Sequence, residues 1–378
     1  MQDTELSARP SPTLLHTGVD VLLNDSLKIE YLKSKKVGLL TNQSSLTADF
    51  TPSAYALYSS LGESLSCLFA PEHGWSAFCG TGEEIDNEQE DYTKLDIFSL
   101  YGPLFEKNLT RLQTLDVLII DVQDIGVRCY TYAATCAKLL EYVSLNKYPL
   151  EVIVCDRPNP LGNKVNGPLL DPDYQSLVSY MNVSFQHGKT IGQLLESHNH
   201  SLDNSVLLSI ISCPSTFNPK FNVWVPPSPG LPDWKAVLLY PGLVFLEGTN
   251  VSEGRGSSLP FKCVAAPKLE YIKLVEMLND IQESGVKAHP FNFTPQSGKL
   301  AGQLCRGAQI HIMDYQKVDG FRMGIFLLYI LFHHYPLFEW RYAEGKYWID
   351  ELTGNSTLRE AINRGQSPQD ILALWKTQ

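Results

Sequence analysis

The amino-acid sequence predicts an α/β protein with a mostly parallel sheet that is covered by helices on both faces. Short strands are apolar throughout, amphipathic stretches alternate with them, and polar clusters follow the strands. A strand with no polar face is buried on both sides, as in a parallel sheet between helices. Strands and helices that alternate with right-handed crossovers form a Rossmann-like, doubly wound sheet.

The first half of the chain supplies five such strands. They are VGLLTN (37–42), SLSCLFA (64–70), DVLIIDVQD (116–124), EVIVCD (151–156) and SVLLSIISC (205–213). The amphipathic stretches predict helices over 52–61, 104–115, 131–143 and 190–200. In open α/β sheets, ligands bind in the crevice beyond the carboxyl ends of the strands. We therefore expect the functional residues at these strand ends.

A proline-rich segment at 214–232 separates this half from the rest of the chain. Proline removes a backbone donor and disfavours helix, so an extended connection is expected. A chain of 378 residues is also long for one core. We predict a Rossmann-like catalytic domain over 14–215, a connection over 216–235 and a second, smaller α/β domain over 236–378. The smaller domain is expected to hold a strand at 308–314 and helices at 268–282, 321–335, 356–363 and 368–376.

Composition and charge exclude several classes of protein. A formal net charge of -11 argues against a nucleic-acid partner, which requires a basic face. No apolar run reaches the roughly 18 residues of a membrane span. The polar start at 1–13 lacks a signal core, so a cytoplasmic location is expected unless a signal peptide has been removed. Eight scattered cysteines without a C-x-x-C pair indicate buried free thiols rather than disulfides or zinc. Both a monomer and a homodimer remain open.

The first polar cluster is APEHGW (70–75), directly after the second strand. Pro71 stiffens the chain, and Gly74 allows a sharp turn that would hold Glu72 and His73 in the crevice. A carboxyl group beside apolar strand residues is suited to general acid catalysis. The alternative is a capped turn with an exposed glutamate. No H-E-x-x-H or comparable set accompanies His73, which argues against a metal site.

The next cluster is CGTGEE (79–84), which has two glycines but no third and no strand immediately before it. The dinucleotide-binding pattern is therefore not met. Either this is a flexible loop, or Glu83 reaches back toward Glu72.

Two further strand ends carry more polar groups than a loop needs. DVQDIGVRCYTY (121–132) combines acids, an amide, an arginine and phenols, and CDRPNPLG (155–162) follows another apolar strand. Asn159 could simply form a turn, and Asp156 could be a structural partner of Arg157. The candidates from these two segments are Asp121, Asp124, Arg128, Tyr130, Asp156, Arg157 and Asn159.

In the second half, LEGTNVSEGRGSS (246–258) presents Glu247, Asn250, Glu253 and Arg255 among three glycines. It is not a phosphate-binding loop, because no Lys-Ser/Thr follows the glycines. It either lies against a ligand or forms a surface Ω-loop. His187 in QHGKTIG precedes a helix, where a lone histidine is more often structural than a base.

Taken together, the polar residues suit a carbohydrate in the cleft between the two domains. Carboxyl groups serve acid catalysis, aromatic rings stack on sugars, and amides bind hydroxyls. G-x-S-x-G, a phosphate loop and metal-ligand spacing are absent from the sequence. Neither a cofactor nor a metal is expected.

Seven motifs occur in order from about Gly18 to the carboxyl terminus: VGLLTNQS, FAPEHGW, DVLIIDVQDIGVRCYTY, DRPNPLG, HGKTIG, LEGTNVSEGRG and GAQIHIMD. Together they resemble the exo-β-N-acetylmuramidases of bacterial peptidoglycan recycling, the NamZ type. The resemblance implies a Rossmann-like domain, a smaller α/β domain and a cleft between them. It also implies release of terminal N-acetylmuramic acid from the non-reducing end of β-1,4-linked peptidoglycan saccharides or muropeptides.

Matching motif by motif, Glu72 is expected to protonate the glycosidic oxygen. Glu83, Asp121 or Glu253 would assist either a water molecule or the substrate's own acetamido group. The expected substrate-binding set is His73, Asp124, Arg128, Tyr130, Asp156, Arg157, Asn159, His187, Asn250, Glu253 and Arg255. The competing hypothesis is a non-catalytic muropeptide- or amino-sugar-binding protein with the same cleft.

The sequence departs from the family pattern at Gln186 and Gln193, where the family carries arginine and glutamate. If the missing arginine holds the lactyl carboxylate of muramic acid, substrate preference would differ.

Overall fold

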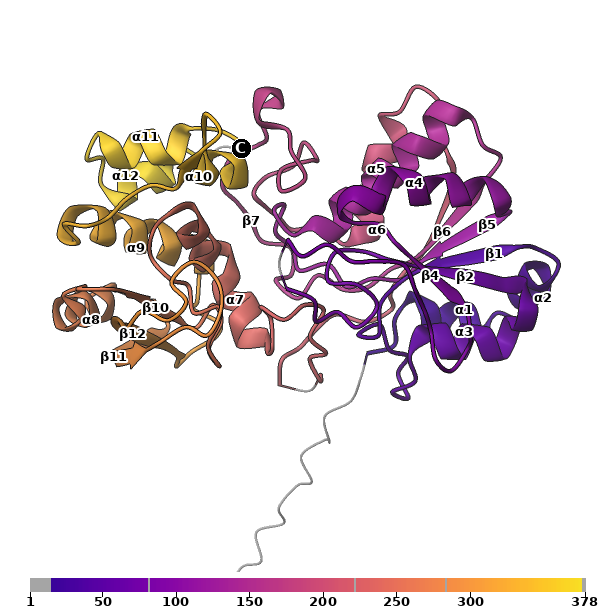
Figure 1. The fold of residues 1–378 in the computed structure, drawn as a ribbon, viewed down its shortest axis with the longest axis horizontal. Coiled ribbons are helices and arrows are strands. Elements are labelled where there is room, and N and C mark those ends of the chain that lie inside the picture. Colours follow the sequence, from indigo (N-terminus) through magenta and orange to yellow (C-terminus); the bar gives the residue numbers. More distant parts are fainter. Residues whose placement is uncertain (1–14, 81, 221, 283, 376–378) are drawn as a thin grey trace, which may run out of the picture.

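The computed structural model describes residues 15–80, 82–220, 222–282 and 284–375. A seven-stranded sheet of order β3-β4-β2-β1-β5-β6-β9 forms the centre of the amino-terminal part (Figure 1). All neighbours pair in parallel except β3 and β4. The strands are β1 (Val37–Leu40), β2 (Leu65–Ala70), β3 (Glu88–Gln89), β4 (Asp96–Ser99), β5 (Val117–Ile120), β6 (Glu151–Cys155) and β9 (Leu207–Ile211).

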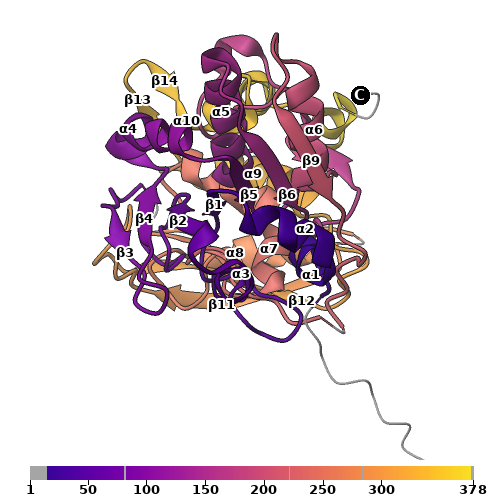
Figure 2. The same cartoon turned by 90° about the vertical axis from the view of Figure 1, so that its right-hand side faces the viewer.

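Helices cover both faces of this sheet, as Figures 1 and 2 show. One face carries α1 (Gly18–Asn24), α2 (Ser26–Lys33) and α3 (Ser53–Leu61), and the other carries α4 (Phe105–Leu109), α5 (Thr131–Asn146) and α6 (Ile191–His200). Successive strand residues feed different cores: Leu39 packs with α1–α3, whereas Leu40 packs with α4–α6. This explains why the strands are apolar at every position.

The predicted strands all form, and the doubly wound α/β fold is confirmed. The predicted helix at 104–115 is only partly α-helical, because α4 gives way to a 3₁₀ helix at Thr110–Thr114. The structure adds α1, α2 and β4, which the sequence pattern did not reveal. These elements are short, so periodicity is weak evidence for them.

The proline-rich segment contains neither helix nor strand among its described residues and leads into the carboxyl-terminal part. There, an antiparallel sheet of order β10-β12-β11 packs against α8 (Tyr271–Asn279). The elements are α7 (Trp234–Leu243), β10 (Cys263–Ala266), α8 (Tyr271–Asn279), β11 (Val286–Phe293), β12 (Cys305–Ile312), α9 (Gly320–His334), β13 (Tyr342–Ala343), β14 (Lys346–Tyr347), α10 (Trp348–Thr353), α11 (Thr357–Asn363) and α12 (Pro368–Ala373). None of the helices that the structure describes is long and apolar enough to span a bilayer.

The two parts share a continuous apolar core. The ring of Phe185, just before the small strand β8 (Gln186–His187) that pairs with β7 (Val165–Asn166), lies 5.1 Å from the ring of Phe245 and 5.8 Å from that of Phe321. The Arg128 guanidinium reinforces this junction by donating to the carbonyl oxygen of Thr353 in α10. The walls of any site between the two parts are therefore held together by packing and by buried hydrogen bonds.

Candidate active site

A cavity of about 290 Å³ lies between the amino- and carboxyl-terminal parts. Both parts contribute polar side chains to it. Those that line the cavity are Glu72, His73, Tyr101, Tyr130, Thr131, Ser228, Tyr240, Glu247, Arg255 and Arg341. The rings of Phe261 and Trp348 complete its wall. This mixture of carboxyl groups, phenols and aromatic faces is typical of sites that bind a polyhydroxylated ligand.

Glu72 enters the cavity from the turn that follows β2, and only 5% of the residue is exposed. Thr131 Oγ1, at the first position of α5, donates to Glu72 Oε2 over 2.7 Å. The backbone N–H of Gly82 donates to Oε1 over 3.3 Å. Burial and the neighbouring Glu72 raise the pKa of the Tyr101 phenol to about 12. The Glu72 carboxyl group is thus fixed by the two hydrogen bonds from Thr131 and Gly82 and is largely removed from bulk water.

His73 lies beside this carboxyl group in the left-handed region, with φ of 74°, and Gly74 follows with φ of 70°. His73 Nδ1 lies 2.7 Å from the carbonyl oxygen of Cys79, which can only accept. Nδ1 therefore carries the proton and Nε2 has a free lone pair. Burial lowers the pKa of His73, although Glu72 opposes the shift. The ring is neutral at neutral pH and can accept a hydrogen bond.

Glu247 is the second carboxyl group that lines this cavity within the described part of the chain. It pairs with Arg255, whose guanidinium also lies over the Phe261 ring, 4.7 Å from its centroid. Burial opposes the charge of Arg255, but Glu247 and then Glu253 raise its pKa. Arg255 therefore stays charged and forms an ion pair with Glu247 in the cavity wall.

Glu253 lies next to this pair but lines a neighbouring cavity of about 170 Å³. Its carboxylate is 3.1 Å from Lys299 Nζ and 3.6 Å from the Arg255 guanidinium. Burial would raise the pKa of Glu253, yet Lys299 and Arg255 lower it. Glu247, Arg255 and Arg341 line both cavities.

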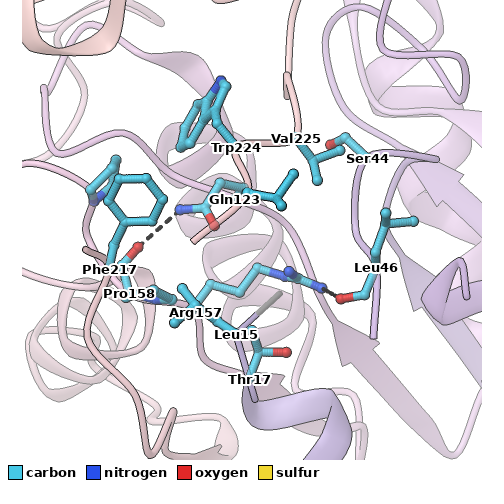
Figure 3. Close-up of a pocket in the computed structure, with 12 residues that line it drawn as sticks. Leu15, Thr17, Ser44, Leu46, Gln123, Arg157, Pro158, Phe217, Trp224 and Val225 are labelled. Carbon is cyan, nitrogen blue, oxygen red and sulfur yellow. Dashed lines mark hydrogen bonds between the residues drawn. The ribbon is translucent and has the colours of Figure 1, made fainter. Parts of the chain in front are cut away.

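Asp121 and Arg157 are placed outside the Glu72 cavity. Arg157 binds Asp121 through two hydrogen bonds, Nε to Oδ1 over 2.6 Å and Nη2 to Oδ2 over 2.9 Å. Arg157 Nη2 also donates to the carbonyl oxygen of Leu46, at a separate pocket of only about 40 Å³ (Figure 3). Both charges are buried and satisfied by each other.

The remaining amino-terminal candidates also serve local structure. Asp124 Oδ2 accepts from the backbone N–H of Gly126 and lies 3.3 Å from His187 Nε2. Asp156 accepts from the N–H of Gly192 over 2.9 Å at the start of α6, and burial raises its pKa. Asn159 forms a turn with the N–H of Leu161. None of these four candidates, Asp124, Asp156, Asn159 and His187, lines the Glu72 cavity.

Arg128 is likewise absent from the cavity wall. It is buried and directs its donors to Ser179 Oγ and to the carbonyl oxygens of Pro168, Val183 and Thr353. Desolvation lowers the pKa of this guanidinium to about 10. Four of its five N–H donors are used in this way, so it connects the two parts of the structure rather than facing a ligand.

Glu83 and Asn250, two candidates on loops, do not line the Glu72 cavity. Glu83 is exposed, and its carboxylate accepts from the N–H of Gly80 over 2.8 Å. Its loop does reach Glu72, but through the backbone of Gly82. Asn250 binds the carbonyl oxygen of Leu337 over 2.6 Å and lies outside the cavity lining.

The two departures from the family pattern also lie away from the cavity lining. Gln186 is buried and accepts from Asn166 over 3.0 Å. Gln193 accepts from the N–H of Thr190 in a capping box, a position where glutamine and glutamate are equivalent. Neither change removes a side chain from the cavity.

Several cavity residues escaped the sequence reasoning. Tyr101 follows β4, a strand that the sequence pattern did not reveal. Ser228, Tyr240, Arg341 and Trp348 do not follow a strand of the main sheet closely enough to be singled out. Glu247 was noted in the polar cluster at 246–258 but was not among the predicted site residues. Tyr130, which was predicted, lines the cavity, and its buried hydroxyl has no hydrogen-bond partner among the described residues. Such a group is available to a ligand.

Comparison with known proteins identifies similar sequences and folds. Residues 37–235 match a family model described as exo-beta-N-acetylmuramidase NamZ, N-terminal, and residues 238–378 match its C-terminal counterpart. The chain is 34% identical over 365 residues to peptidoglycan beta-N-acetylmuramidase NamZ of Bacillus subtilis (strain 168), covering 95% of this chain and 86% of the relative.

Two solved structures from Bacteroides fragilis NCTC 9343, both of DUF1343 family proteins, share the fold. The protein BF0371 is 27% identical with a TM-score of 0.82, covering 96% of this chain and 95% of that one. The protein BF0379 is 25% identical with a TM-score of 0.72, covering 96% and 94%.

Proposed function

The chain belongs to the NamZ family of β-N-acetylmuramidases and is a glycosidase, and we propose that it releases terminal N-acetylmuramic acid from the non-reducing end of β-1,4-linked peptidoglycan fragments. The observation that carries this proposal is the buried, hydrogen-bonded Glu72 carboxyl group in a cavity rich in tyrosines. The volume of about 290 Å³ is near the lower end of the roughly 300–1,000 Å³ of ligand pockets. It suits one terminal sugar better than a run of sugars.

Glu72 acts as the general acid in this proposal. Its proton moves to the glycosidic oxygen as the bond to the anomeric carbon breaks, which leaves a Glu72 carboxylate and a neutral alcohol. The donors of Thr131 and Gly82 then stabilise the new charge. Removal of the acid from such a site typically costs a factor of about 10² to 10⁴ in rate.

Glu247 is the second carboxyl group in the proposed mechanism. It takes the role that sequence reasoning left among Glu83, Asp121 and Glu253, because it shares the cavity with Glu72. Opposite the leaving group, it either accepts a proton from the attacking water or binds the N–H of the 2-acetamido group. The first route inverts the anomeric configuration and the second retains it, so the anomer of the first product distinguishes them.

Incubation with the N-acetylmuramyl-N-acetylglucosamine disaccharide, followed by mass analysis of the products, tests the activity. The wild type should release both monosaccharides. Glu72→Gln should lower the rate at least about 10²-fold, whereas Glu106→Gln, an exposed carboxyl group on α4, should not change it. Near-full activity of Glu72→Gln would refute the assigned role.

The alternative raised from the sequence, a non-catalytic amino-sugar-binding protein, does not agree with the family match to a glycosidase. Binding alone gives no reason to place two carboxyl groups in one cavity, because burying charge is costly. Binding of the disaccharide without any turnover would favour this alternative.

A further inference from the structure

Arg341 is a cation at the Glu72 cavity whose charge no side chain in the described part of the chain neutralises. It lines the cavity and is exposed to solvent. No ion pair or side-chain hydrogen bond joins its guanidinium to any other described residue. A carboxylate or another anion from a ligand can therefore reach it.

The position of Arg341 is set by its backbone rather than by its charge. Its N–H donates to the carbonyl oxygen of Gly248 over 2.8 Å, and its own carbonyl oxygen accepts from the N–H of Trp348 over 3.0 Å. The first contact anchors it beside Glu247. The guanidinium carbon lies 5.1 Å from the centroid of the Trp348 ring. This stacking limits the side chain's freedom and so favours a defined geometry for a bound anion.

The other arginines near the site are already occupied. Arg255 pairs with Glu247 and lies near Glu253, Arg157 is bound to Asp121, and Arg128 is filled by backbone and hydroxyl oxygens. An additional anion would compete with these partners for any of the three. Arg341 requires no such exchange.

The charges of the residues that line the cavity also favour an anionic ligand. Glu247 and Arg255 compensate each other, and His73 is neutral because burial lowers its pKa. When Glu72 carries the proton that it donates, Arg341 leaves one unbalanced positive charge on the lining. A substrate with a single negative charge matches this state.

We propose that Arg341 binds the lactyl carboxylate of muramic acid and so sets the preference for muramic acid over glucosamine. This inference rests on the proposed muramidase function. The two sugars differ by the lactyl ether on O3, whose carboxylate is the only charge on the muramic residue. The planar guanidinium matches a carboxylate with two parallel hydrogen bonds. Arg341 is thus a specificity residue and takes no part in bond cleavage.

The test compares two chromogenic β-N-acetylmuramides, one with the free lactyl carboxylate and one with its neutral primary amide. Wild type should prefer the carboxylate in kcat/KM by about tenfold to a hundredfold, the range of a charge-assisted hydrogen bond. Arg341→Gln should lose this preference because its kcat/KM falls on the carboxylate substrate alone, while its kcat/KM on the amide stays at the wild-type value. Arg341→Lys should keep part of the preference, because the charge remains without the fork.

Arg306→Gln is the matched control, since Arg306 is exposed on β12 and lines neither cavity. It should behave as the wild type. Retained preference in Arg341→Gln would overturn the proposal, and so would an equal loss on both substrates, which would indicate a general effect on the site.

Binding measurements separate this inference from the proposed function. Calorimetry with free N-acetylmuramic acid and its lactyl amide, on Glu72→Gln and on Glu72→Gln/Arg341→Gln, repeats the comparison without turnover. If the wild type cleaves neither substrate, the muramidase proposal fails. The binding ratio then still decides the role of Arg341: loss of the carboxylate preference in the double variant supports it, and an unchanged ratio refutes it.

Discussion

Replacing Arg128 with methionine tests the idea that one buried arginine holds the two walls of the cavity together. Methionine fills a similar volume with an apolar, flexible chain. It removes the donors that reach Ser179 and the carbonyl oxygens of Pro168, Val183 and Thr353. The guanidinium is 5% exposed as a residue, so water does not readily replace those donors.

The expected cost follows from the groups left behind. A buried polar group without a partner costs about 1–3 kcal/mol, but removal of the charge also cancels its own desolvation penalty. Three carbonyl oxygens and one hydroxyl, partly rehydrated after relaxation, give a net loss of about 3–5 kcal/mol in the free energy of unfolding. That is a large fraction of the roughly 5–15 kcal/mol typical of a folded protein.

Urea denaturation of the wild type, Arg128→Met and Arg306→Met measures this loss. The exposed Arg306 controls for removal of an arginine as such and should change stability by less than about 0.5 kcal/mol. Because Thr353 belongs to α10 and its neighbour Leu352 lines the cavity, Arg128→Met should also raise KM. A loss below about 1 kcal/mol would refute the reasoning, because the four oxygens would then not depend on Arg128.

Three further predictions follow from the same structure. Tyr130→Phe should leave the unfolding midpoint unchanged or slightly higher, because the buried hydroxyl has no partner among the described residues. It should nevertheless lower kcat/KM by about 5- to 20-fold, because one hydrogen bond to the ligand is lost. An unaltered kcat/KM would remove this residue from the site. Asp121→Asn should lower the free energy of unfolding by about 3–5 kcal/mol, since it leaves the buried Arg157 charge unpaired. The folded fraction of this variant should keep the wild-type kcat. A selective loss of kcat would make Asp121 catalytic. Burial lowers the pKa of His73 in the folded protein below its ordinary value of 6.5. As the pH falls, the unfolded chain therefore binds this proton before the folded protein does. The contribution of the neutral ring to the free energy of unfolding is thus present above pH 6.5 and is lost as the pH falls below it. His73→Asn should therefore flatten the decline of stability as the pH falls below 6.5 in chemical denaturation, and an equally steep decline would contradict the assignment.

The strands of the main sheet were predictable because their burial leaves a local trace in the sequence. VGLL at 37–40 and VLII at 117–120 are apolar at every position, as a strand between two helical layers must be. Short elements such as β4 were missed because four residues with two exposed or half-buried positions carry little periodicity.

The position of polar residues at strand ends was a weaker guide to the site. It drew attention to Glu72, which lines the cavity, but equally to Asp121 and Arg157, which do not. All three follow buried strands, so local pattern treats them alike. Asp121 and Arg157 follow the neighbouring strands β5 and β6 and satisfy each other, and only the sheet order β1-β5-β6 brings them within 2.6 Å.

By itself, the sequence determined the fold class and the family, because strand burial and motif order are properties of contiguous residues. Tertiary structure alone decided which charged groups share a cavity. Glu72, Glu247 and Arg341 are far apart along the chain and meet because the carboxyl-terminal part packs against the ends of the sheet. Whether a buried arginine is free to bind a ligand depends on the oxygens around it, and those come from distant segments that no local pattern brings together.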